Sequence, residues 1–171
     1  MVTPSQREAI RRAYRFQCGY CSVHENDVGS ALEIDHFQPL SSGGTDEESN
    51  LVYACSACNK AKGDFWSSPN TETRLLHPQR DALEAHIRLS PDDRWQPLTS
   101  TGAFHMRRLR LNRPQLVALR QARRRATQHI ARLTELETQI VAFRQEIASL
   151  EGQLAILLEH IRRLLGQYCK R

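Results

Sequence analysis

The chain has 171 residues, of which 40% are hydrophobic and 25% charged, and its formal net charge is +5 at pH 7. This length suits one domain, or one small domain with an extension. No apolar run approaches the ~20 residues that a membrane-spanning helix needs. The first residues also lack the apolar core of a secretory signal. We therefore expect no membrane association and a cytoplasmic location, where cysteines are kept reduced and bind metals more often than they form disulfides.

The first third of the chain predicts short elements separated by turns. Apolar spacing and an early proline predict a helix over residues 4–16. Residues 31–37 are short and partly apolar, which indicates a strand, and residues 50–54 predict a second extended segment. A helix is expected over residues 58–64. Strand, strand and helix would then follow one another in a small domain.

Residues 64–102 are less regular, because four prolines interrupt them. One helix is predicted over residues 80–88, and a turn into a short strand over residues 90–95. We expect this region to cap a core that has little apolar content of its own. The first domain is accordingly expected to comprise residues 1–103.

A long helix is predicted from Pro114 onward, inside a second region that comprises residues 104–171. Its apolar residues alternate by three and four, which is the a/d pattern of a coiled coil. This pattern indicates a homodimer through residues 133–168. Ile and Leu at the core positions favour parallel pairing, whereas Glu146 facing Glu151 opposes it. A helix folded back on its own domain is the open alternative. The core positions are Leu133, Leu136, Ile140, Phe143, Ile147, Leu150, Leu154, Leu157, Ile161, Leu164 and Tyr168.

Four of the five cysteines form two Cys-x-x-Cys pairs. These pairs are Cys18 with Cys21 and Cys55 with Cys58. Four thiolates at this spacing can close a tetrahedral cage around a structural zinc ion. Cys169 is expected to be a free thiol.

Hard ligands and a base lie between and just beyond the cysteine pairs. His36 directly follows a carboxylate, Asp35, at the expected end of a strand, and Asn59 follows the last cysteine. Imidazole is a suitable base near neutral pH. A carboxylate and an amide oxygen leave most coordination positions to water and phosphate, which suits Mg²⁺. These residue types are the ones that phosphodiester hydrolysis with a divalent cation uses.

This combination of motifs resembles the HNH endonuclease family, whose core is a zinc-supported ββα-metal (treble-clef) finger. The resemblance implies His36 as the general base, and Asp35 and Asn59 as ligands of a catalytic cation. It implies that Asn50 braces the loop that orients His36. Because Asn59 stands where many members have histidine, Mg²⁺ or Mn²⁺ is expected there rather than zinc. The matching segments are Glu33–Pro39, Gly43–Asp46, Asn50–Leu51 and Cys55–Gly63.

Basic residues predict contacts with DNA phosphates. No acidic residue occurs over residues 104–132, whereas a solvated helix face would mix charges of both signs. Two lysines beside the last motif are further candidates, although solvated lysines are equally compatible with that position. The expected DNA-binding residues are Lys60, Lys62, Arg107, Arg108, Arg123, Arg124 and Arg125.

Together these patterns predict an α+β protein with a small zinc-stabilised ββα-metal nuclease domain followed by a long C-terminal coiled-coil helix. The predicted function is a metal-dependent DNA endonuclease that nicks or cleaves both strands. Two alternatives stay open. One is a zinc-dependent nucleic-acid-binding module that does not cut. The other is a nuclease subunit controlled by a protein partner bound through the coiled coil.

Overall fold

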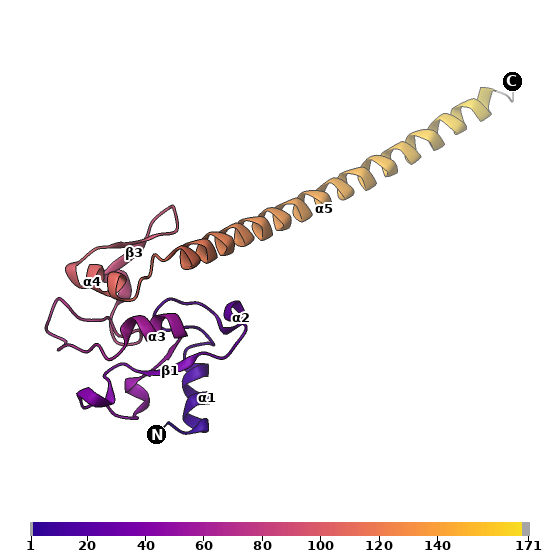
Figure 1. Ribbon diagram of the computed structural model, residues 1–171. Coiled ribbons are helices and arrows are strands. Elements are labelled where there is room, and N and C mark those ends of the chain that lie inside the picture. Colours follow the sequence, from indigo (N-terminus) through magenta and orange to yellow (C-terminus); the bar gives the residue numbers. More distant parts are fainter. Residues whose placement is uncertain (1, 169–171) are drawn as a thin grey trace. The chain divides into compact units, whose positions relative to one another are not determined.

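The computed structural model describes residues 2–168, and their side chains up to residue 165. The chain divides into two compact units, the first extending to Gln121 and the second beginning at Ala122. Figure 1 shows most of the elements. In chain order they are α1 (Pro4–Ala13), α2 (Glu25–Val28), β1 (Glu33–His36), η1 (Leu40–Ser42), η2 (Glu48–Asn50), β2 (Leu51–Ala54), α3 (Ser56–Lys62), η3 (Leu83–Ala85), β3 (Ile87–Leu89), β4 (Trp95–Pro97), α4 (Ser100–Arg108) and α5 (Pro114–Tyr168).

The predicted α+β class is confirmed, because two small antiparallel sheets combine with helices, a cysteine cluster and a long C-terminal helix. Strands β1 and β2 pair in antiparallel fashion, with Asp35 opposite Val52 and His36 opposite Leu51. Helix α3 follows β2 directly and contacts β1. The motif residues therefore lie on two neighbouring strands and the helix that follows them.

The core of the first unit is built around β2, all four of whose residues are buried. Apolar residues from the end of this unit join the same core, namely Leu109, Leu111 and Leu116. For this reason the first unit extends beyond residue 103, where the sequence placed the domain boundary. The start of α5 is thus part of the core that supports the motif residues.

The helix predicted over residues 80–88 is wrong. Only the short 3-10 helix η3 lies within this range, and from Ile87 the chain forms strand β3. Strands β3 and β4 form a hairpin, in which Ile87 is opposite Pro97. Ile87 is buried, and the carbonyl of His86 accepts a hydrogen bond from Leu98 N at 2.8 Å. Helix α4 packs closely beside this hairpin, since a Cβ atom on Gly102 would lie 2.0 Å from the His86 carbonyl oxygen. Contacts with β4 and α4, which are distant in sequence, therefore override the local helix pattern.

The second unit consists of the part of α5 that begins at Ala122. Its heptad core residues up to Leu164 are exposed, with relative exposures from 37% to 63%. The side chain of Tyr168 and the whole of Cys169 lie outside the described residues, so the predictions made for them stay predictions. Between residues 2 and 168, no helix is both long and apolar enough to cross a membrane.

Candidate metal centre and active site

The four cysteines of the two Cys-x-x-Cys pairs converge. Their sulfur atoms lie within 4.8 Å of one another, and the Sγ atoms of Cys21 and Cys55 are 3.7 Å apart. Four sulfurs held about 2.3 Å from one zinc ion in a tetrahedron would lie about 3.8 Å apart. The cluster therefore fits a tetrahedral zinc ion in donor type and spacing.

Backbone hydrogen bonds hold the first cysteine pair against the sheet. The amide of Gly19 donates to Tyr53 O at 2.8 Å, and the amide of Cys18 donates to Val23 O at 2.8 Å. Hydrogen bonds with the neighbouring thiols raise the pKa of Cys58 above its ordinary value, and the bond with Cys18 has the largest effect. Four thiols this close oppose one another's ionisation, and a bound cation removes that conflict because it takes all four as thiolates.

An arginine from the end of the first unit covers the cysteine cluster. The Nη1 atom of Arg113 lies 3.6 Å from Cys58 Sγ, and its Nη2 atom lies 3.8 Å from Cys21 Sγ and 3.7 Å from Cys55 Sγ. Burial lowers the pKa of Arg113, but the nearby thiols outweigh burial and the net shift is upward. In the sequence Arg113 is one of several arginines within the acid-free residues 104–132, and no local spacing links it to the cysteines.

His36 lies at the end of β1 and is held by a carboxylate that sequence reasoning left without a role. Its Nε2 atom is 2.8 Å from Oδ1 of Asp46. The loop that carries Asp46 turns sharply at Gly44, where a Cβ atom would lie 1.9 Å from Gln38 O. The only signal for Asp46 in the sequence was its place in the Gly-Gly-Thr-Asp segment.

Asn50 is buried behind the same loop. Its Oδ1 accepts a hydrogen bond from Gln38 N at 2.8 Å, and its Nδ2 donates to Gln38 O at 3.0 Å and to Thr45 O at 2.9 Å. Asn50 thereby joins both sides of the loop between His36 and Asp46.

Asp35 is buried, and both of its carboxylate oxygens have partners. Lys62 Nζ lies 2.9 Å from Oδ1, and the hydroxyl of Tyr20 donates to Oδ2 at 2.5 Å. Burial raises the pKa of Asp35, and Lys62 offsets part of that rise. The sequence is equally compatible with a phosphate contact and with a solvated side chain for Lys62. Its side chain is instead buried, with Nζ also donating to His36 O at 2.7 Å, because the ammonium group compensates the buried carboxylate.

Asn59 lies on α3 and is oriented by a second carboxylate. Its Nδ2 atom donates to Glu33 Oε2 at 2.6 Å, and this bond leaves the Oδ1 atom as an acceptor. One open cleft of about 530 Å³ brings the predicted catalytic residues and both lysines together. Its polar and charged lining consists of Asp35, His36, Ser41, Asn59, Lys60, Lys62 and Asp64.

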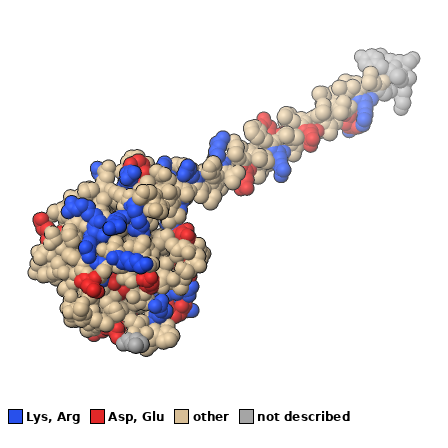
Figure 2. Space-filling model, viewed as in Figure 1, with Lys and Arg blue, Asp and Glu red and all other residues tan. Residues whose placement is uncertain are grey.

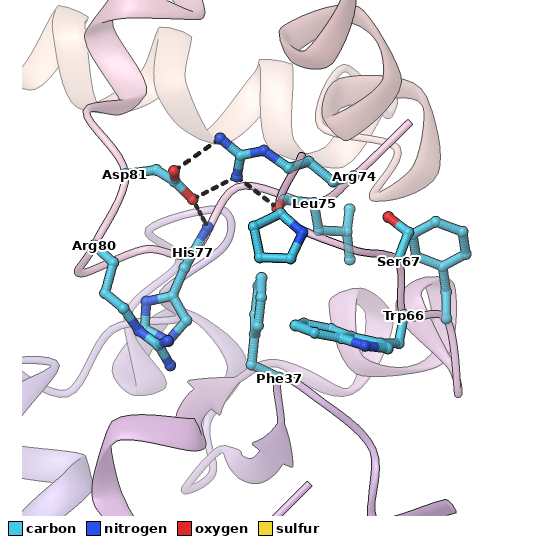
Figure 3. A pocket seen from close by; sticks show the side chains of 10 residues that line it. Phe37, Trp66, Ser67, Arg74, Leu75, His77, Arg80 and Asp81 are labelled. Carbon is cyan, nitrogen blue, oxygen red and sulfur yellow. Dashed lines mark hydrogen bonds and ion pairs between the residues drawn. The ribbon is translucent and has the colours of Figure 1, made fainter. Parts of the chain in front are cut away.

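A separate, smaller cavity of about 190 Å³ is lined in part by Phe37, the residue that follows His36. Figure 3 shows Phe37 between His77 and Trp66, whose ring centroids are 4.6 Å and 5.8 Å from that of Phe37. Arg74 and Asp81 form an ion pair of 2.8 Å at its rim. None of the predicted catalytic residues lines this cavity. We therefore infer that its side chains support the end of β1 and take no part in catalysis.

The comparison with protein-family models identifies this arrangement. Residues 18–65 match the model described as HNH endonuclease. The chain contains an HNH domain. The matched segment includes all four cysteines together with β1, β2 and α3. A search of curated proteins and a search of solved structures each found no match.

Basic side chains gather on the unit that carries the HNH domain (Figure 2). Lys60 lines the cleft with His36 and also borders a hollow with Arg110 and Arg113. Some of the arginines that were expected to bind DNA have internal partners. Arg108 donates to Lys62 O at 2.7 Å. Arg107 in this unit and Arg123, Arg124 and Arg125 in the second unit are exposed.

Proposed function

We propose that this chain is a metal-dependent endonuclease that hydrolyses phosphodiester bonds of DNA. The observation that carries the proposal is the shared cleft, where His36, Asp35 and Asn59 lie together and Lys60 supplies a positive charge at the rim. Lys60 and the exposed arginines would contact the phosphate backbone, which confers affinity without sequence preference.

His36 acts as the general base. Because its Nε2–H donates to the carboxylate of Asp46, the lone pair of the neutral imidazole is on Nδ1. Nδ1 takes a proton from a water molecule, whose oxygen forms a bond to phosphorus while the bond to the leaving oxygen breaks. Asp46 and Asn50 position His36 in this step, Asp46 through the ring and Asn50 through the loop.

Asp35 and Asn59 would hold a divalent cation in this cleft. They offer a carboxylate and an amide oxygen, which suit Mg²⁺ or Mn²⁺. When bound, the cation supplies positive charge to the phosphate and the leaving oxygen. Glu33 orients Asn59 through its amide, and Tyr20 fixes one oxygen of Asp35.

One observation favours a second candidate, an HNH domain that binds nucleic acid without cutting it. Lys62 Nζ is paired with Asp35, so an ammonium group stands beside the carboxylate that a cation would need. If Lys62 keeps that position in the presence of Mg²⁺, its positive charge opposes the binding of a second cation by Asp35. The domain would then retain binding through its basic residues alone.

The test is cleavage of supercoiled plasmid by the zinc-loaded full chain, with and without added Mg²⁺ or Mn²⁺. We expect nicked or linear product only with the added cation. His36→Ala should lower the rate by ~10²-fold or more while zinc content stays the same. His129→Ala, a change at an exposed histidine of the second unit, is the matched control. Equal cleavage by His36→Ala and wild type would remove His36 as the base, whereas binding without cleavage under all conditions would favour the second candidate.

We further propose that the chain self-associates through the apolar stripe of α5. The stripe repeats over residues 133–164 with its members exposed, and a helix with one exposed apolar seam is stabilised when a second helix covers it. A partner of different sequence bound at this seam is the competing outcome, and it predicts a monomeric wild type.

A further inference from the structure

The exposed stripe of the second unit is complementary to its own reversed copy. The seven positions of a heptad are called a to g, and the residues at a and d form the seam. When one of two paired helices is reversed, each a residue packs against a d residue of the other helix. We place the two-fold axis that relates the two helices between Ala148 and Ser149. Each of the ten described core residues then packs against a core residue of the second copy. The resulting pairs are Leu133–Leu164, Leu136–Ile161, Ile140–Leu157, Phe143–Leu154 and Ile147–Leu150, each formed twice.

We propose that this stripe pairs with a second copy of the chain in antiparallel orientation, about that axis. The inference rests on the self-association proposed above and is independent of the nuclease activity.

Charges beside the seam select this orientation. In a parallel pair, position g faces position e of the next heptad, so Glu146 would face Glu151 of the second copy. In an antiparallel pair, e faces e and g faces g. Arg144 then faces Glu151 of the second copy, and symmetry forms this ion pair twice. Glu146 faces the neutral Gln153, so the like-charge contact disappears.

The same charges also select the register. If one helix were shifted by one heptad along the other in one direction, Arg144 would face Arg144 of the second copy and Glu137 would face Glu151. A shift in the other direction would place Glu151 opposite its own copy. Like charges directly opposite one another disfavour both alternatives, as flanking charges do in other coiled coils.

The remaining observations agree with this arrangement. Phe143 is 63% exposed and would meet its own copy across a parallel seam, whereas the antiparallel seam places it against Leu154. Within the described part of the chain, the side chains of Arg144 and Glu151 have no hydrogen-bond or ion-pair partner, so both are available to a second copy.

Antiparallel pairing separates the two ends of the helix pair. At 1.5 Å per residue, the two copies of residue 122 lie about 80 Å apart. The two HNH domains are therefore attached at opposite ends of the paired helices.

Charge reversal tests the orientation. We would measure the dimer dissociation constant of the full chain by sedimentation equilibrium for Arg144→Glu, Glu151→Arg and the double variant. Each single change turns two attractive contacts into two repulsive ones and should weaken the dimer by about tenfold, and the double variant should restore it. Gln145→Glu, which adds a charge on the outer face, is the control and should leave the dissociation constant unchanged.

Parallel pairing predicts a different pattern. Glu151→Arg would then remove the contact between Glu146 and Glu151 and tighten the dimer, and that result would overturn the antiparallel assignment. A wild type that is monomeric at micromolar concentration would overturn pairing with a second copy altogether. Plasmid cleavage is measured separately, so an inactive chain that forms the predicted dimer contradicts the nuclease proposal and leaves this inference standing.

Discussion

The Nη1 atom of Arg113 lies 3.6 Å from the Sγ atom of Cys58, although 55 residues separate them in the chain. The guanidinium group also reaches the sulfurs of Cys21 and Cys55. Four thiolates around one zinc ion carry a net charge of about −2, and a partly buried cation that donates to three of them offsets that charge. Arg113 therefore links the last part of the first unit to its metal centre.

Replacing this arginine should weaken the zinc site. We expect Arg113→Gln to lower zinc affinity by 10- to 100-fold, the usual range for residues that hydrogen-bond to metal ligands. Transfer of zinc to a chromogenic chelator measures the effect. Arg110→Gln removes a neighbouring positive charge without touching the sulfurs and is the matched control. Equal zinc transfer by both variants would show that the contacts to sulfur contribute nothing to metal binding.

Loss of a cysteine should unfold the first unit selectively. The binding energy of a structural zinc ion is largely folding energy, on the order of 10 kcal/mol in small zinc peptides. Cys55→Ser should lose zinc and the tertiary signals of the aromatic residues, while the circular dichroism of α5 persists. Cys169→Ser is the control, because Cys169 belongs to neither Cys-x-x-Cys pair. A folded, zinc-free Cys55→Ser protein would contradict a structural role for the metal.

The buried ion pair between Lys62 and Asp35 gives a test of the cation site that needs no activity. Lys62→Met leaves a buried carboxylate unpaired and should destabilise the first unit by about 3–5 kcal/mol. If Asp35 is a cation ligand, Mg²⁺ or Mn²⁺ should restore part of that loss and raise the melting temperature of Lys62→Met more than that of the wild type. Asp35→Asn combined with Lys62→Met should abolish the response. Identical responses to the cation in the wild type and Lys62→Met would place the cation elsewhere.

A buried histidine should make the first unit sensitive to acid. Burial lowers the pKa of His105 from its ordinary value near 6.5 to about 4. The unfolded chain takes up a proton near pH 6.5 and the folded chain only near pH 4, so stability is complete above pH 6.5 and falls between these values. The loss is about 2 kcal/mol at pH 5. In urea titrations at pH 7 and pH 5, His105→Asn should show a smaller difference than the wild type, and His129→Asn the same difference.

Local spacing made part of this structure predictable. The first Cys-x-x-Cys pair needs only a tight turn and the second only the first turn of α3, and the short strand that ends in Asp35 and His36 shows its partly apolar character over a few residues. The two-strand hairpin and α3 follow in the order that the sequence predicts. The long helix α5 was also predictable, because one helical spacing repeats over many turns.

Contacts between distant segments were not predictable in this way. Lys62 looks like any solvated lysine of a helix, and only the position of Asp35 on the neighbouring strand explains its burial. Asp46 reaches His36 because a glycine turn brings the loop back. Residues 80–88 were predicted to form one helix, yet only Leu83–Ala85 form a 3-10 helix, and the chain pairs with β4 from Ile87 onward.

The position of Arg113 in the chain has a consequence for how the protein is made. Synthesis proceeds from the N-terminus, so the cysteines leave the ribosome well before the arginine that covers them and the Leu116 side chain that completes the core. Residue 164, the end of the apolar stripe, is added to the growing chain about 5 s after Arg113 at a synthesis rate of roughly 10 residues per second. The HNH domain can therefore bind zinc and close its core while still attached to the ribosome. Its helix becomes long enough to pair with another chain only after that.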